Sequence, residues 1–96
     1  MGAQDFMQKS KGKTAREAFD NAVQQAQYDF GHAGYTGSMA EKSSYVLIPV
    51  PDGKDPVEFA HDLLAYDDER INDKWGPAGC VEIAKGEYIF VGWASS

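Results

Sequence analysis

The segment from Gly31 to Lys42, GHAGYTGSMAEK, is the part of this 96-residue chain whose residue types and spacing most suggest chemistry. Glycines recur at every third position, and an imidazole, a phenol, two hydroxyls, a carboxylate and an ammonium lie among and after them. Such glycines let a backbone approach a ligand closely. We therefore predict a ligand-binding loop, completed by a tryptophan from a later loop. Its predicted binding residues are His32, Gly34, Tyr35, Thr36, Gly37, Ser38, Glu41, Lys42 and Trp75.

This loop differs from known phosphate loops. A P-loop ends in GK[ST], and a dinucleotide-binding loop joins a strand to a helix start. Here the glycines follow a predicted helix end, where the macrodipole disfavours anions. If residues 35–41 are extended, Thr36, Ser38 and Lys42 share one side of the backbone, and Glu41 lies on the other. That edge suits a polar or nucleotide-like small ligand. The alternative is a tight helix-to-strand connection whose hydroxyls satisfy turn backbone.

Catalysis is a further hypothesis. His32 can act as a general base only if a carboxylate such as Glu41 orients it, and the sequence does not fix that geometry. We therefore assign no catalytic residue and favour a non-enzymatic binding module over a small hydrolase or transferase. We also predict no cofactor and no metal site, because one cysteine and two histidines offer no zinc-binding spacing.

The sequence of residues 31–42 resembles a segment of small uncharacterised bacterial and phage proteins. In these proteins a glycine-rich stretch is followed by YTG and then by AEK. The resemblance covers twelve of the 96 residues. It brings no established activity, but it implies a compact accessory protein of bacterial or phage origin.

The charge is divided unevenly along the chain. Residues 1–16 carry four basic groups and one acid, whereas residues 17–96 carry five basic groups and fourteen acids. An acidic body repels phosphates, so direct nucleic-acid binding is disfavoured. It also suggests the main alternative function: an acidic interaction or inhibitor module acting through a helix over 56–73, which includes Asp67, Asp68 and Glu69, or through the C-terminal hairpin.

The elements that position these groups follow from the pattern. Residues 1–13 lack periodicity and predict a flexible basic lead-in. Thr14 and Glu17 form a capping box, and apolar residues at three- and four-residue spacing then predict a helix that Gly31 ends. No membrane span or signal peptide is seen, so we expect a cytoplasmic protein without membrane partners.

The second half predicts a strand over 44–50, a helix that Asp55 caps and Pro56 begins, and a hairpin over 80–94. A two-residue turn would place Val81 opposite Phe90 and Ile83 opposite Tyr88 on a core face. The other hairpin face is also apolar, and is either covered by a helix or used for self-association, so we expect a homo-oligomer. Residues 14–96 are thus predicted to form a single α+β domain. It would have an antiparallel sheet of three to four strands packed against two helices, in the order helix, strand or strands, helix, hairpin.

Overall fold

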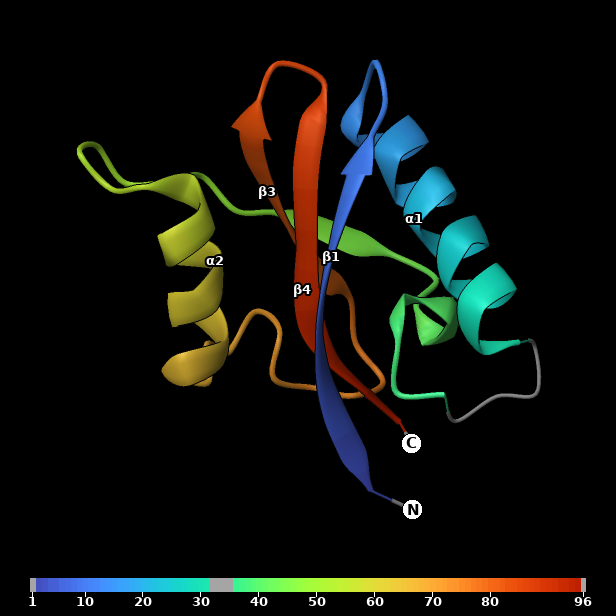
Figure 1. Ribbon diagram of the computed structural model, residues 1–96. Coiled ribbons are helices and arrows are strands. Elements are labelled where there is room, and N and C mark those ends of the chain that lie inside the picture. The colour runs from blue at the N-terminus through green and yellow to red at the C-terminus, as the bar shows by residue number, and fades with distance from the viewer. Residues whose placement is uncertain (1, 32–35, 96) are drawn as a thin grey trace.

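The computed structural model describes residues 2–31 and 36–95. Within these residues the chain forms an α+β fold, which confirms the expected class (Figure 1). The elements in order are β1 (Ala3–Lys11), α1 (Ala15–Phe30), the 3-10 helix η1 (Met39–Glu41), β2 (Tyr45–Leu47), α2 (Pro56–Ala65), β3 (Ala78–Ala84) and β4 (Glu87–Ser95).

The described strands form one sheet in the order β1-β4-β3-β2. β1 and β3 both pair with β4 in the antiparallel sense, but β2 pairs with β3 in the parallel sense. The sheet is therefore mixed, and the expectation of a purely antiparallel sheet is wrong in this respect. Parallel neighbours need a crossover connection, and the long segment from β2 to β3, which contains α2, provides it.

β1 corrects the expectation of a flexible lead-in, because the fold begins with a strand and not with a helix. It pairs with β4 along its whole length, from Ala3 opposite Ser95 to Lys11 opposite Glu87. β1 lies at the edge of the sheet, and polar and charged residues are common on edge strands, which explains its weak hydrophobic pattern.

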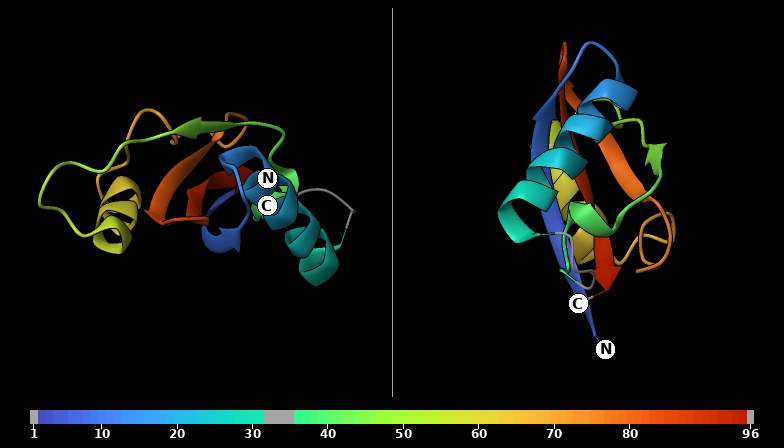
Figure 2. Two further views of the ribbon diagram at one scale, coloured as in Figure 1. Left: turned by 90° about the horizontal axis from the view of Figure 1, so that it is seen from above. Right: turned by 90° about the vertical axis from the view of Figure 1, so that its right-hand side faces the viewer.

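Each face of the sheet is covered by a helix, and Figures 1 and 2 show α1 and α2 on opposite sides of it. The α1 side buries aromatic residues: the ring centroids of Phe19 and Tyr45 are 5.0 Å apart, and those of Phe19 and Phe90 are 5.7 Å apart. The α2 side buries aliphatic residues of the helix, of the two central strands, and of the segments that follow β2 and α2. These aliphatic residues are Ile48, Ala60, Leu63, Ile71, Val81, Ile89 and Val91.

The hairpin register differs from the expected one. A bulge between Glu82 and Ala84 shifts the pairing, so that Val81 lies opposite Ile89 and Cys80 opposite Phe90. One extra residue in a strand turns the following side chains to the other face. Ile89 and the neighbouring Val91 are fully buried and pack with residues of α2, so the second apolar face of the hairpin is core.

The helix caps form as the sequence predicts. Thr14 Oγ1 accepts a hydrogen bond from Glu17 N at 3.1 Å, and an Asp55 side-chain oxygen accepts one from Glu58 N at 3.0 Å. Gly31 ends α1 with a φ of 88°. α2, however, ends at Ala65 and does not reach residue 73.

Candidate functional site

The predicted loop is described from Thr36 onward. The predicted binding residues His32, Gly34 and Tyr35 lie outside the described residues. Residues 39–41 form η1 and not the extended segment considered from the sequence. The described part of the loop therefore turns back on itself, and this brings Glu41 next to Thr36.

Three of the predicted residues form one hydrogen-bonded cluster. Glu41 Oε2 accepts from Thr36 N at 3.1 Å and from Thr36 Oγ1 at 2.8 Å. Since the Thr36 hydroxyl donates to this carboxylate, the Ser38 hydroxyl is left to donate to Thr36 Oγ1, at 2.7 Å. Ser38 Oγ in turn accepts from Ala40 N at 3.2 Å and caps η1. These bonds hold residues 36–41 in one shape, as in the tight-connection alternative.

Lys42 lies apart from the hydroxyls of the loop. Only 5% of the residue is exposed, and its Nζ lies 2.8 Å from Gly76 O, 3.3 Å from Lys74 O and 3.5 Å from Asp73 O. Burial lowers the pKa of this ammonium, and the charge of Asp73 partly opposes that shift. Lys42 thus ties the segment before β2 to the loop before β3.

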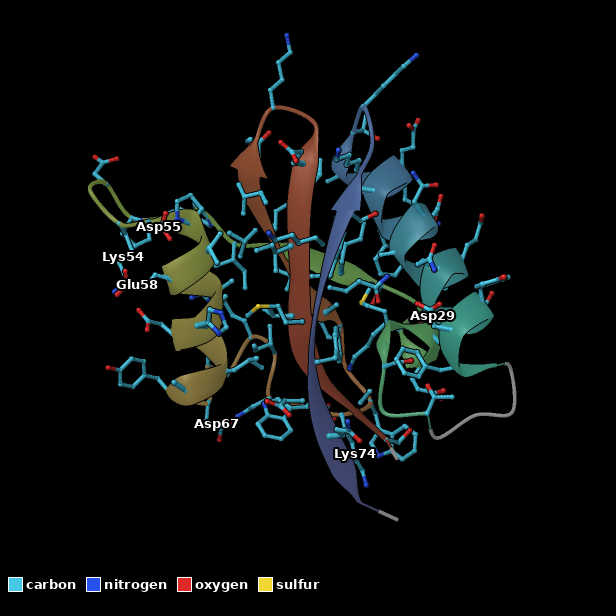
Figure 3. All side chains as sticks on the ribbon, in the orientation of Figure 1. Asp29, Lys54, Asp55, Glu58, Asp67 and Lys74 are labelled. Carbon is cyan, nitrogen blue, oxygen red and sulfur yellow. The ribbon has the colours of Figure 1, made fainter. Side chains whose placement is uncertain are left out.

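Trp75 belongs to the loop that Lys42 holds. Its backbone N–H donates to Asp73 Oδ1 at 2.9 Å, and its residue surface is 65% exposed. The Nζ of Lys74 lies 5.3 Å from the centre of the indole ring, and it also donates to Gly2 O at 3.3 Å, beside the start of β1 (Figure 3). Trp75 is not among the described residues that line the groove beside Thr36.

That groove runs between β1, α1 and the loop, and encloses about 410 Å³. Three predicted loop residues, Thr36, Gly37 and Ser38, form one wall. Six consecutive residues of β1, numbered 4–9, form another. The third wall comes from the second half of α1, where Figure 3 shows Asp29. The lining residues on α1 are Gln25, Asp29 and Phe30.

The backbone of β1 faces this groove at alternate residues. In an antiparallel pair, the N–H and C=O of one residue point to the same side, and successive residues alternate. Gly12 N donates to Gly86 O at 3.1 Å, so even-numbered residues of β1 bond to β4. Lys11 O accepts from Asn21 Nδ2 at 2.8 Å, on the outer side. The outer edge of β1 thus presents the backbone groups of Asp5, Met7 and Lys9.

Neither β1 nor the α1 wall is predicted by the sequence pattern. One signal was present in the lead-in: Phe6, Gln8 and Ser10 alternate with the remaining residues and face α1. Phe6 packs against the α1 core, and the side chains of Gln8 and Ser10 donate to Ala22 O at 2.8 Å and to Ala18 O at 2.7 Å. Since this period-two pattern is largely polar, hydrophobic periodicity could not reveal it.

A second, more open hollow of about 620 Å³ lies at the opposite end of β1. Lys11, Lys13 and Lys85 line it together with Glu17, which accepts a hydrogen bond from Lys13 N at 3.3 Å. Exposed lysines at strand ends are common on solvated surfaces, and this hollow contains no residue of the predicted loop.

In the acidic segment after α2, an arginine of the same segment neutralises part of the negative charge. Arg70 donates to Asp68 from Nε to Oδ1 at 2.9 Å and from Nη2 to Oδ2 at 2.8 Å. These bonds lower the pKa of Asp68 to about 2. Asp67 adopts a left-handed φ of 52° just after the helix, where the chain turns. One of the three predicted acidic residues is therefore already paired.

The chain matches no known protein-family model, and no curated protein or solved structure is significantly similar to it. No group of three or more histidine, cysteine, aspartate or glutamate side chains that could hold a metal ion occurs among the described residues. In the same part of the chain, neither helix has the length and apolar character needed to cross a membrane.

Proposed function

We propose that this protein is a non-enzymatic binding module that holds an extended polypeptide segment against the outer edge of β1. The observation that carries the proposal is that six consecutive residues of this edge strand line a groove, together with Thr36, Gly37 and Ser38 of the predicted loop. An extended peptide that adds a strand to an open sheet edge gains backbone hydrogen bonds and places alternate side chains in flanking pockets.

The charge of the groove favours a peptide over a nucleotide-like ligand. Among the described lining residues one is basic, Lys9, and two are acidic, Asp5 and Asp29. Lys42, the cation expected to serve an anion, is buried against backbone carbonyls. A polar ligand held through neutral backbone groups is compatible with this slightly acidic lining, but a multiply charged phosphate would be repelled.

The loop supports such a role as a preformed wall. Since Glu41 binds both the N–H and the hydroxyl of Thr36, the wall is held in place before any ligand arrives. This arrangement lowers the entropy cost of binding. The Glu41 carboxylate, which a hydrolase or transferase would need to orient His32, is bonded to Thr36 in this arrangement. The geometry therefore supports binding better than catalysis. The proposal keeps the cytoplasmic location and the bacterial or phage origin that the sequence suggests.

Selection of peptides from a random display library, followed by titration of synthetic copies, tests the proposal. The informative pair is Lys9→Pro and Lys9→Ala. Proline removes the outward N–H of residue 9 without removing a bond to β4, whereas alanine keeps that N–H. We expect peptides whose binding survives Lys9→Ala and is lost in Lys9→Pro. Equal binding of a selected peptide by both variants would refute strand addition, as would a monomeric chain that selects no peptide.

A thermal-shift screen against nucleotides and cyclic nucleotides examines the other ligand class. We expect no ligand-dependent shift, because Lys9 is the one cation among the described residues of the groove, and phosphates need several donors of positive charge. A thermal shift that disappears in Thr36→Val and Ser38→Ala would support the hypothesis of a nucleotide-like ligand bound at the loop. A shift that disappears in Lys13→Ala and Lys85→Ala would assign the nucleotide to the basic hollow instead.

A further inference from the structure

We infer that the strand bound at this edge is β1 of a second copy of the chain, in an antiparallel pair centred on Met7. This inference rests on the proposed function and names its partner. The pair would join two four-stranded sheets, and the backbone groups left unbonded by β4 would bond to their symmetry-related counterparts.

The charges on β1 are self-complementary in this register. With Met7 opposite its own copy, Asp5 of each chain lies opposite Lys9 of the other. Both side chains are exposed and both residues line the groove. Opposite charges at facing positions of antiparallel strands stabilise the pair, and like charges destabilise it. One register thus places both ionic pairs symmetrically about the two-fold axis.

The neighbouring symmetric registers fit less well. Centring the pair on Gln8 would set Asp5 opposite Lys11, whose carbonyl already accepts a hydrogen bond from Asn21. It would also set the half-buried Met7 opposite Lys9. Centring it on Phe6 would place Asp5 opposite Met7 and leave Lys9 without an acidic partner. Only the register centred on Met7 uses both charges of the open edge.

The geometry of an antiparallel pair also settles how the helices lie. Residues that face each other across such a pair point to the same side of the sheet. Both copies of α1 would therefore lie on one face of the joined sheet, and both copies of α2 on the other. The groove beside β1, bounded by Gln25, Asp29 and Phe30, provides the space next to the edge into which the second strand enters.

The inference is tested on the full chain by sedimentation equilibrium and native mass spectrometry. We expect a dimer for the unaltered protein. Asp5→Lys and Lys9→Asp each place two like-charge contacts in the pair, so each should raise the dissociation constant about tenfold or more. Mixing the two variants restores opposite charges at every facing position, and we expect a heterodimer as strong as the original homodimer.

The mixture of the two variants shows whether the loss of dimerisation comes from this register, because a general effect of charge or misfolding would not be reversed by mixing. Circular dichroism of each single variant should match that of the unaltered chain, because both side chains are exposed. If a variant fails to fold, Lys9→Pro against Lys9→Ala gives the second measurement, with dimerisation lost only in the proline variant. Unaltered dimerisation in both charge reversals, or a mixture that stays monomeric, would overturn the inference.

The outcome also distinguishes this inference from the function on which it rests. A chain that is monomeric at high concentration, yet binds selected peptides in a manner that Lys9→Pro abolishes, would refute the dimer and leave the binding module intact. A monomer that binds no peptide would refute both.

Discussion

Replacing Lys42 with methionine tests whether this lysine stabilises the fold or serves to bind a ligand. Methionine keeps most of the aliphatic stem and removes the ammonium. In the structure that ammonium donates to carbonyl oxygens of Asp73, Lys74 and Gly76, at 3.5, 3.3 and 2.8 Å. We therefore expect Lys42→Met to destabilise the fold by releasing the loop before β3.

The size of the effect follows from these distances. A hydrogen bond to a charged group contributes about 1.5–3 kcal/mol, and only the bond to Gly76 O is short. Removing the cost of burying an ammonium offsets part of the loss. We expect a net loss of about 2 kcal/mol in the free energy of unfolding, which for a domain of this size lowers Tm by roughly 8–16 °C.

The assay is urea unfolding followed by tryptophan fluorescence, with Lys85→Met as the matched control. Lys85 is exposed at the β3–β4 turn, so its replacement should change stability by less than about 0.5 kcal/mol. If Lys42→Met is as stable as the Lys85→Met control, the lysine does not hold the loop. Its predicted role in contacting a ligand would then regain support.

The comparison of the unaltered chain with Lys42→Met also predicts how the free energy of unfolding depends on pH. Burial lowers the pKa of Lys42 below its ordinary value of 10.5, so the folded chain releases this proton before the unfolded chain does. Between the folded-state pKa and 10.5 the unfolded state binds more protons, and stability rises with pH. We expect the unaltered chain to gain stability over Lys42→Met as pH rises through this window. No such gain, or a decline, would show that burial does not penalise the charge.

Three further predictions concern the fold. A Cβ on Gly12 would lie 2.5 Å from the backbone nitrogen of Ala18, so Gly12→Ala should cost about 1–3 kcal/mol or more by urea unfolding; a neutral effect would contradict this close approach. Burial, helped by Glu82, raises the pKa of Cys80 to about 12, so its thiol should react with a disulfide reagent at pH 8 only after unfolding. Arg70→Met should raise the pKa of Asp68 from about 2 toward 3.8, as measured by NMR titration, and an unchanged value would disprove their pairing. The stabilisation from this pairing is present above pH 3.8 and is lost as pH falls through about 2.

Local signals in the sequence were sufficient for the starts of both α-helices and for the end of α1, but not for the end of α2 at Ala65. The side chains of Thr14 and Asp55 each bond to a backbone N–H three residues later, and such caps depend only on near neighbours. Gly31 likewise ends α1 with a positive φ, as its position after the apolar stripe indicated. The α+β class then followed from the alternation of helical and strand-like patterns.

What the sequence did not reveal depends on distant contacts. β1 is a strand because β4 pairs with it, and its own residues show little hydrophobic alternation. The parallel pairing of β2 depends on where α2 carries the chain. The bulge at Ile83 cannot be seen in the residues of a hairpin whose faces are both apolar, since either register buries a plausible set of side chains.

The arrangement of the predicted site also differs from the expected one, because it depends on contacts that the local sequence does not reveal. An extended conformation of residues 35–41 would place Lys42 on the same side as the hydroxyls of Thr36 and Ser38. η1 turns the chain instead, so that Glu41 binds the hydroxyl of Thr36 and Lys42 reaches the loop before β3. The loop keeps a place in the proposed function because Thr36–Ser38 still borders the groove. Lys42, the cation predicted to contact an anionic ligand, is bound within the fold to the carbonyl of Gly76.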